Sequence, residues 1–163
     1  MPPLALGFGE ASLKDKLFID EFYHSEFNKM QAVCGFHKMA RKIVELVKEK
    51  GKIPVLATNP LFPYTATENR MRWAGLEPEI FEAYTTYEDC HYCKPNPKYY
   101  LELLEKLGLK PEECMMVGND FDEDIVPTEA LGMKGFLLTD CLINKNGVDI
   151  SVYPQGNFEA LKE

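Results

Sequence analysis

The sequence predicts a parallel α/β fold, and three short apolar runs carry that prediction. These runs, near residues 53–58, 114–118 and 134–139, have the length and near-continuous apolar character of strands that are buried on both faces of a sheet. A helix is expected after residue 58, another after residue 94 and a third after the acidic segment near residue 120. These helices end at Gly75, Gly108 and Gly132. Strands that alternate with helices form βαβ units with right-handed crossovers, so we expect a parallel sheet.

The remaining elements are expected as follows in chain order. A helix starts at the capping residue Ser12 and buries one apolar stripe, which consists of Leu13, Leu17, Phe18, Phe22, Phe27 and Met30. Further helices are expected at residues 36–50, 63–73, 97–107 and 125–131, with a short one at 157–162, and residues 81–87 form an extended segment. Residues 4–8 form either a short strand or a loose tail, and residues 140–156 form a loop. Residues 1–35 do not fit the alternation of strands and helices, so we expect them to lie outside the sheet.

Composition excludes several classes of protein. The 163 residues suffice for one domain with a substantial core. A net charge of -8 argues against a general nucleic-acid-binding protein, which needs a surplus of Lys and Arg. No apolar run approaches the roughly 20 residues of a membrane-spanning helix, so no membrane partner is expected. Five cysteines, an odd number, fit free thiols in a reducing compartment, and we expect a cytoplasmic protein.

Polar residues with phosphate and metal chemistry stand at predicted strand ends and in one loop. Thr58 and Asn59 follow the first apolar run, Lys94 lies in the loop before the helix at 97–107, and Asp120 and Asp124 follow Gly118. Ligands of open parallel sheets bind beyond the carboxyl ends of the strands. Carboxylates suit Mg²⁺, whereas a hydroxyl and an ammonium group suit a phosphate. Each of these groups also has a purely structural explanation. The aspartates would form an acidic first helical turn, Thr58 would cap a helix, and Lys94 would be solvated.

The order and spacing of these segments resemble the haloacid dehalogenase-like hydrolase superfamily, most of whose members are phosphatases. The resemblance covers about residues 36–145 and is carried by VLATN, CKPNPKYY, VGNDFDED and GMKGFLLTD. It implies a three-layer α/β/α Rossmann-like parallel sheet at residues 36–163, preceded by a tail and a partial helical cap at residues 1–35. It also implies that Thr58, Asn59 and Lys94 bind the phosphate of a small phosphorylated metabolite. Mg²⁺ would be held by Asp120 and Asp124, and Asn119 is an alternative ligand through a carbonyl oxygen.

Two departures from the family pattern leave two functions open. The family's first motif, an apolar strand that ends in Asp-x-Asp and supplies the nucleophile, has no match upstream of residue 35, so we expect a truncated chain. The family usually places Asp where Asn119 stands. The chain is therefore either a Mg²⁺-dependent phosphatase, which acts through an aspartyl-phosphate in the intact family, or an inactive phosphate- and metal-binding remnant. In the family's strand order the sheet should have a gap between the strands that end at Thr58 and Gly118, unless residues 4–8 fill it.

Overall fold

The computed structural model describes residues 13–162, and its elements follow the predicted order. The helices are α1 (Leu13–His24), α2 (Met39–Glu49), α3 (Tyr64–Trp73), α4 (Pro97–Leu107) and α5 (Val126–Ala130). The strands are β1 (Val55–Leu56), β2 (Ala83–Tyr84), β3 (Met115–Gly118), β4 (Lys134–Leu138) and β5 (Gln155–Gly156). Short turns of 3₁₀ or π helix complete the chain: η1 (Glu26–Val33), η2 (Pro78–Ile80), η3 (Pro111–Glu113), η4 (Phe121–Ile125) and η5 (Ala160–Lys162).

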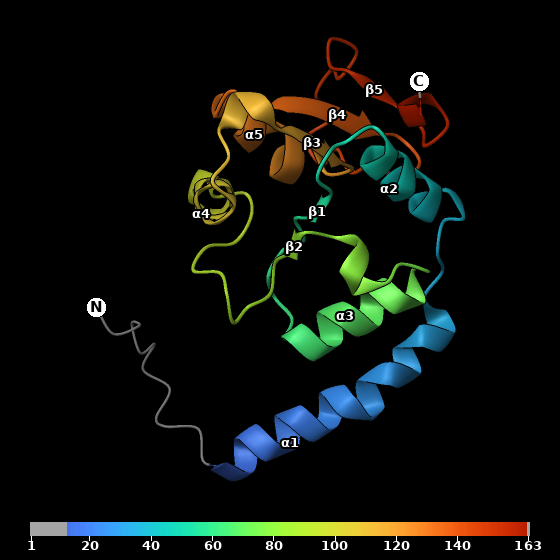
Figure 1. Ribbon diagram of the computed structural model, residues 1–163, viewed down its shortest axis with the longest axis vertical. Helices are drawn as coiled ribbons and strands as arrows, with labels where there is room; N and C mark the ends of the chain where they lie inside the picture. The colour runs from blue at the N-terminus through green and yellow to red at the C-terminus, as the bar shows by residue number, and fades with distance from the viewer. Residues whose placement is uncertain (1–12, 163) are drawn as a thin grey trace.

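All strand pairs within the described residues are parallel, which confirms the predicted α/β class. β1 pairs with β2, whereas β3, β4 and β5 form a second sheet in that order. Figure 1 shows β1 and β2 near the centre of the molecule, with α3 on one side and the second sheet on the other. No ladder joins β1 to β3 in the part of the chain that the structure describes, and the expected gap between them stays a prediction. Residues 4–8, the alternative filling of that gap, lie outside the described residues.

The first helical region differs from the prediction in length and in burial. α1 ends at His24, and the chain continues as the 3₁₀ helix η1. The predicted stripe is largely exposed, with Leu17 at 59% and Phe18 at 72% of full exposure. The physical reason is that α1 and η1 pack against α3 rather than against a sheet, and Phe27 supplies the aromatic contact, with ring centroids 5.4 Å from Trp73. The predicted cap Ser12 lies outside the described residues.

Three further elements differ from expectation. β5 lies in a stretch that was expected to be a loop; its two residues pair with Leu137 and Leu138 and are too few to give a strand pattern in the sequence. The segment after β3 begins with a π turn, η4, and becomes α-helical only at Val126. Such π turns are rare and often occur at functional sites. β1, expected to be buried, is two residues long and half-buried.

Two buried clusters hold the segments that carry the predicted site residues. Tyr99 and Tyr100 of α4 pack with Met116 of β3. Phe121 and Ile125 of η4 pack with Leu137 of β4. Because the apolar side chains of η4 are fixed against β4, the carboxylates between them are held in a defined direction. The core therefore positions the acidic segment and the start of α4 relative to each other.

Candidate functional site

The centre of the candidate site is a buried ion pair between Lys94 and Asp124. Lys94 comes from the loop between β2 and α4, and Asp124 comes from η4. The Lys94 Nζ–Asp124 Oδ1 distance is 2.6 Å, and the two side chains are 7% and 8% exposed. The loop is followed by a well-capped helix, because Asn96 Oδ1 accepts a hydrogen bond from the Lys98 N–H at 3.0 Å. Thirty positions of sequence separate the two charges, and the fold brings them into direct contact.

A tight backbone contact fixes the second oxygen of Asp124. Asp124 Oδ2 accepts the backbone N–H of Asp120 at 3.0 Å. A Cβ atom on Gly118 would lie 2.2 Å from that same oxygen, so the end of β3 admits the carboxylate only because residue 118 is glycine. Asp120 in turn caps η4, since its Oδ1 accepts the N–H of Glu123 at 3.0 Å. The two predicted metal-binding aspartates thus lie together, although both carry protein partners.

The end of β1 is tied to the same region through α4. The carbonyl oxygen of Thr58 accepts hydrogen bonds from the hydroxyls of Tyr99, at 2.8 Å, and Thr85, at 2.6 Å. The Tyr100 hydroxyl donates to the carbonyl oxygen of Glu123 at 2.6 Å. Burial raises the pKa of both tyrosines well above the ordinary value, so both stay neutral hydrogen-bond donors. Two adjacent residues of α4 therefore hold the end of β1 and the acidic turn in place.

Asn59 faces the acidic turn directly. Its Nδ2 donates to Glu123 Oε2 at 3.5 Å. Its Oδ1 is buried and has no hydrogen-bond partner among the described residues. Buried oxygens are rarely left unpaired, so this atom is available to a ligand, a water molecule or a cation.

Asn119 is oriented differently from the two aspartates. Its side-chain Nδ2 donates to the Cys141 carbonyl oxygen at 2.8 Å, and its own carbonyl oxygen accepts the Ile143 N–H at 2.8 Å. Both interactions attach Asn119 to the loop after β4. Its role as a metal ligand stays a prediction.

Several residues that contact the site were not predicted from the sequence. The hydroxyls of Tyr99 and Tyr100 hold the carbonyl oxygens of Thr58 and Glu123 in position. Lys145 Nζ lies 3.3 Å from Asp120 Oδ2, and Asn146 Nδ2 donates to Asp122 Oδ2 at 3.0 Å. Nothing in the local sequence marks Lys145 or Asn146, because they lie in an irregular loop more than twenty residues after the aspartates.

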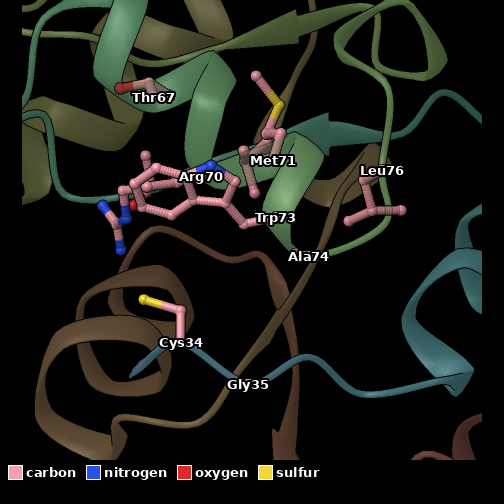
Figure 2. A pocket seen from close by; sticks show the side chains of 10 residues that line it. Cys34, Gly35, Thr67, Arg70, Met71, Trp73, Ala74 and Leu76 are labelled. Carbon is pink, nitrogen blue, oxygen red and sulfur yellow. The ribbon is translucent and has the colours of Figure 1, made fainter. Parts of the chain in front are cut away.

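A cavity of about 290 Å³ opens beside Thr58. It lies between α3 and the segment Cys34–Gly35 and is lined mainly by apolar side chains. Figure 2 shows Arg70 and Trp73 on the α3 side and Cys34 opposite them. The cavity adjoins the end of β1, where the predicted phosphate-binding residues begin.

Comparison with known proteins shows the family of this chain. A family model described as haloacid dehalogenase-like hydrolase matches residues 9–132, which is most of the chain. The chain belongs to the haloacid dehalogenase-like hydrolases. Two of its relatives have names that describe phosphatases. It is 35% identical over 80 residues to a glyceraldehyde 3-phosphate phosphatase of Methanothermobacter thermautotrophicus. It is 29% identical over 114 residues to the pyrophosphatase PpaX of Bacillus cereus.

These matches cover different shares of the proteins compared. The alignment with the Methanothermobacter protein spans 45% of this chain and 35% of that protein, and the alignment with PpaX spans 70% and 50%. The chain thus spans half or less of the length of these two relatives.

Solved structures show the same haloacid dehalogenase-like fold. The HAD phosphatase of Thermococcus onnurineus matches with a TM-score of 0.66 at 21% identity, over 90% of this chain and 68% of that one. CbbY of Rhodobacter sphaeroides, solved in complex with phosphate, matches with a TM-score of 0.64 at 16% identity, over 89% and 64%. The three-layer, Rossmann-like α/β fold expected from the sequence is therefore confirmed.

Proposed function

We propose that this chain binds a small phosphate ester together with Mg²⁺, and that its site carries out phosphatase chemistry when the family's Asp-x-Asp nucleophile is present. Thr58, Asn59 and Lys94 bind the phosphate, while Asp120 and Asp124 bind the metal ion. The observation that carries the proposal is the buried Lys94–Asp124 pair, at 2.6 Å, beyond the carboxyl end of β3. Open parallel sheets bind their ligands at this edge.

The donor atoms near Asp124 are compatible with Mg²⁺. Within residues 13–162 no group of three or more His, Cys, Asp or Glu side chains is arranged as a metal site. Mg²⁺ does not require such a group, because it is commonly held by one or two carboxylates, water and substrate oxygens. Asp120 and Asp124 supply two carboxylates, and the unpaired Asn59 Oδ1 is a further oxygen close to Glu123. When bound, the ion would neutralise charge on the phosphate oxygens.

Lys94 has the geometry of a phosphate-neutralising residue. Its ammonium group is buried, is oriented by Asp124, and lies 5.9 Å from the ring centroids of both Tyr99 and Tyr100. A cation fixed in a partly desolvated site interacts strongly with the charge that develops during phosphoryl transfer. Thr58, at the end of β1, would orient the phosphate through its hydroxyl and backbone. The cavity beside Thr58 would take the organic part of the ester.

A second candidate function follows from the position of the Asp-x-Asp pairs, the motif that supplies the nucleophile in this family. The only Asp-x-Asp pairs in this sequence lie in the acidic segment at residues 120–124. The alternative is therefore a phosphate- and metal-binding protein without enzymatic turnover. Thr58 is a weak substitute as nucleophile, because a hydroxyl needs an adjacent general base. In hydrolases that act through a covalent unit, loss of the nucleophile costs several orders of magnitude in rate.

One assay distinguishes the two functions. Hydrolysis of a general phosphate ester with Mg²⁺ would be measured for this chain, for Lys94→Ala, and for a form in which an Asp-x-Asp strand precedes residue 1. We expect turnover from the form with the added Asp-x-Asp strand, and little or none from the chain alone. Rapid turnover by the chain alone that Lys94→Ala abolishes would reveal a nucleophile within this sequence. Absence of turnover and of phosphate binding in all three forms would refute both candidate functions.

A further inference from the structure

The loop between β4 and β5 folds back over the acidic turn. We refer to residues 140–148 as the strap. Its Ile143 forms a parallel bridge with Asp120: the Ile143 N–H donates to the Asn119 carbonyl oxygen at 2.8 Å, and the Phe121 N–H donates to the Ile143 carbonyl oxygen at 2.9 Å. The side chain of Asn146 adds the hydrogen bond to Asp122 at 3.0 Å. The backbone of the strap is therefore attached to the acidic turn on both sides of Lys145.

Lys145 projects from the strap onto the candidate site. Its Nζ lies 3.3 Å from Asp120 Oδ2 and 3.8 Å from Glu123 Oε1. The side chain is 61% exposed, in contrast to Lys94, which is 7% exposed. Exposed ion pairs are weak and exchange readily, whereas a buried pair holds its geometry. Lys145 is thus a cation with a fixed backbone and a displaceable ammonium group.

We propose that Lys145 is a second phosphate-binding residue, which rests on Asp120 and Glu123 until a phosphate enters the site. The inference rests on the proposed function. Its chemistry is that of a phosphate monoester or inorganic phosphate, whose dianion is bound by two lysines and a divalent cation. Lys94 approaches this group from the β2–α4 loop, and Lys145 approaches it from the strap.

The local charges explain why Lys145 would change partners. Three carboxylates, those of Asp120, Glu123 and Asp124, contact two ammonium groups, those of Lys94 and Lys145. A divalent cation held by Asp120 would compete with Lys145 for that carboxylate and would repel its ammonium group. The four-carbon stem of lysine can redirect that group while the strap keeps its Cα in place. A phosphate bound at the same site would then offer that ammonium group a new anionic partner.

Calorimetric titration of inorganic phosphate into the Mg²⁺-loaded chain tests the inference. The variants are Lys145→Met, Lys145→Arg and Lys134→Met. Lys134 is the matched control, because it pairs with Met115 at the amino end of β3, whereas the site lies beyond the carboxyl end. We expect Lys145→Met to weaken phosphate binding about tenfold, which is the loss of one charge-assisted hydrogen bond. Lys145→Arg should retain most of the affinity, and Lys134→Met should behave as the wild type.

A second titration, of Mg²⁺ alone, separates binding from a merely structural role. Lys145→Met should bind Mg²⁺ a few-fold more tightly, because a competing cation has left Asp120. Weaker binding of both Mg²⁺ and phosphate would mean that the strap has been disordered, and would overturn the proposal. Wild-type phosphate affinity in Lys145→Met would overturn it while leaving the proposed function intact. Absence of Mg²⁺-dependent phosphate binding in the wild type would refute the proposed function and this inference together.

Discussion

Removing the ammonium group of Lys94 should destabilise the protein strongly, because its partner would remain buried. In Lys94→Met the Asp124 carboxylate, 8% exposed, would keep only the Asp120 N–H, at 3.0 Å, as a neutral donor. Breaking a buried ion pair from one side typically costs 3–5 kcal/mol. Since one hydrogen bond to the carboxylate survives, we expect a decrease of about 3 kcal/mol in the free energy of unfolding.

The double variant Lys94→Met/Asp124→Asn provides the internal test. Asparagine keeps an oxygen for the Asp120 N–H but removes the isolated charge, so about 2 kcal/mol of the loss should be recovered. Lys145→Met is the matched control, because it removes the same kind of cation from the same carboxylate cluster. Its ammonium group is largely exposed, so its removal should leave the free energy of unfolding nearly unchanged.

Urea unfolding at neutral pH, followed by far-UV circular dichroism, measures all four proteins. The comparison is valid if the dependence on urea stays constant among them. A Lys94→Met protein within about 1 kcal/mol of the wild type would refute the reasoning, since water would then be solvating Asp124. A double variant that is less stable than Lys94→Met would contradict it independently.

Further predictions concern the same site and its surroundings. Gly118→Ala should lower the free energy of unfolding by about 2 kcal/mol, because its Cβ would lie 2.2 Å from Asp124 Oδ2, whereas Gly35→Ala, with open space around it, should be neutral by urea unfolding. Mg²⁺ should raise the thermal midpoint of the wild type but not of Asp124→Asn in differential scanning fluorimetry; an equal rise in both would exclude that aspartate as a ligand. Burial raises the pKa of Tyr100 and thereby favours its neutral form in the folded state, so stability should fall as the pH rises above about 10, and Tyr100→Phe should reduce this alkaline loss in pH-dependent unfolding. Burial also raises the pKa of Cys90, so mass spectrometry should show that iodoacetamide alkylates it more slowly than the exposed cysteines at mildly alkaline pH; equal rates would contradict the burial argument.

The predicted stripe of α1 shows where sequence periodicity is insufficient. Apolar spacing identifies a helix because it depends only on the geometry of one segment. It does not reveal whether a partner exists to cover that face. Among the described residues, Phe27 contacts Trp73 of α3, whereas Phe18 is 72% exposed. The helix was therefore predictable, whereas its burial depended on packing partners supplied by other elements.

The membrane and compartment expectations have a more limited outcome. Among residues 13–162, no helix is both long and apolar enough to cross a bilayer. The cytoplasmic location stays a prediction.

The boundary near residue 35 between a partial cap and the hydrolase core also stays a prediction. Within the described chain, η1 is followed by an extended connection to α2, and both α1 and η1 contact α3.

The parallel α/β class, the order of the main elements and the three segments that carry Thr58, Lys94 and Asp124 could be predicted from the sequence. Each of these depends on local information: apolar runs, glycine stops and polar residues at the ends of strands. The tertiary structure alone decided which atoms meet. Lys94 pairs with Asp124, two tyrosine hydroxyls donate to backbone oxygens of Thr58 and Glu123, and Lys145 contacts Asp120. Such contacts join residues far apart in the chain, and their geometry is set by the packing of several elements at once, which no single stretch of sequence encodes.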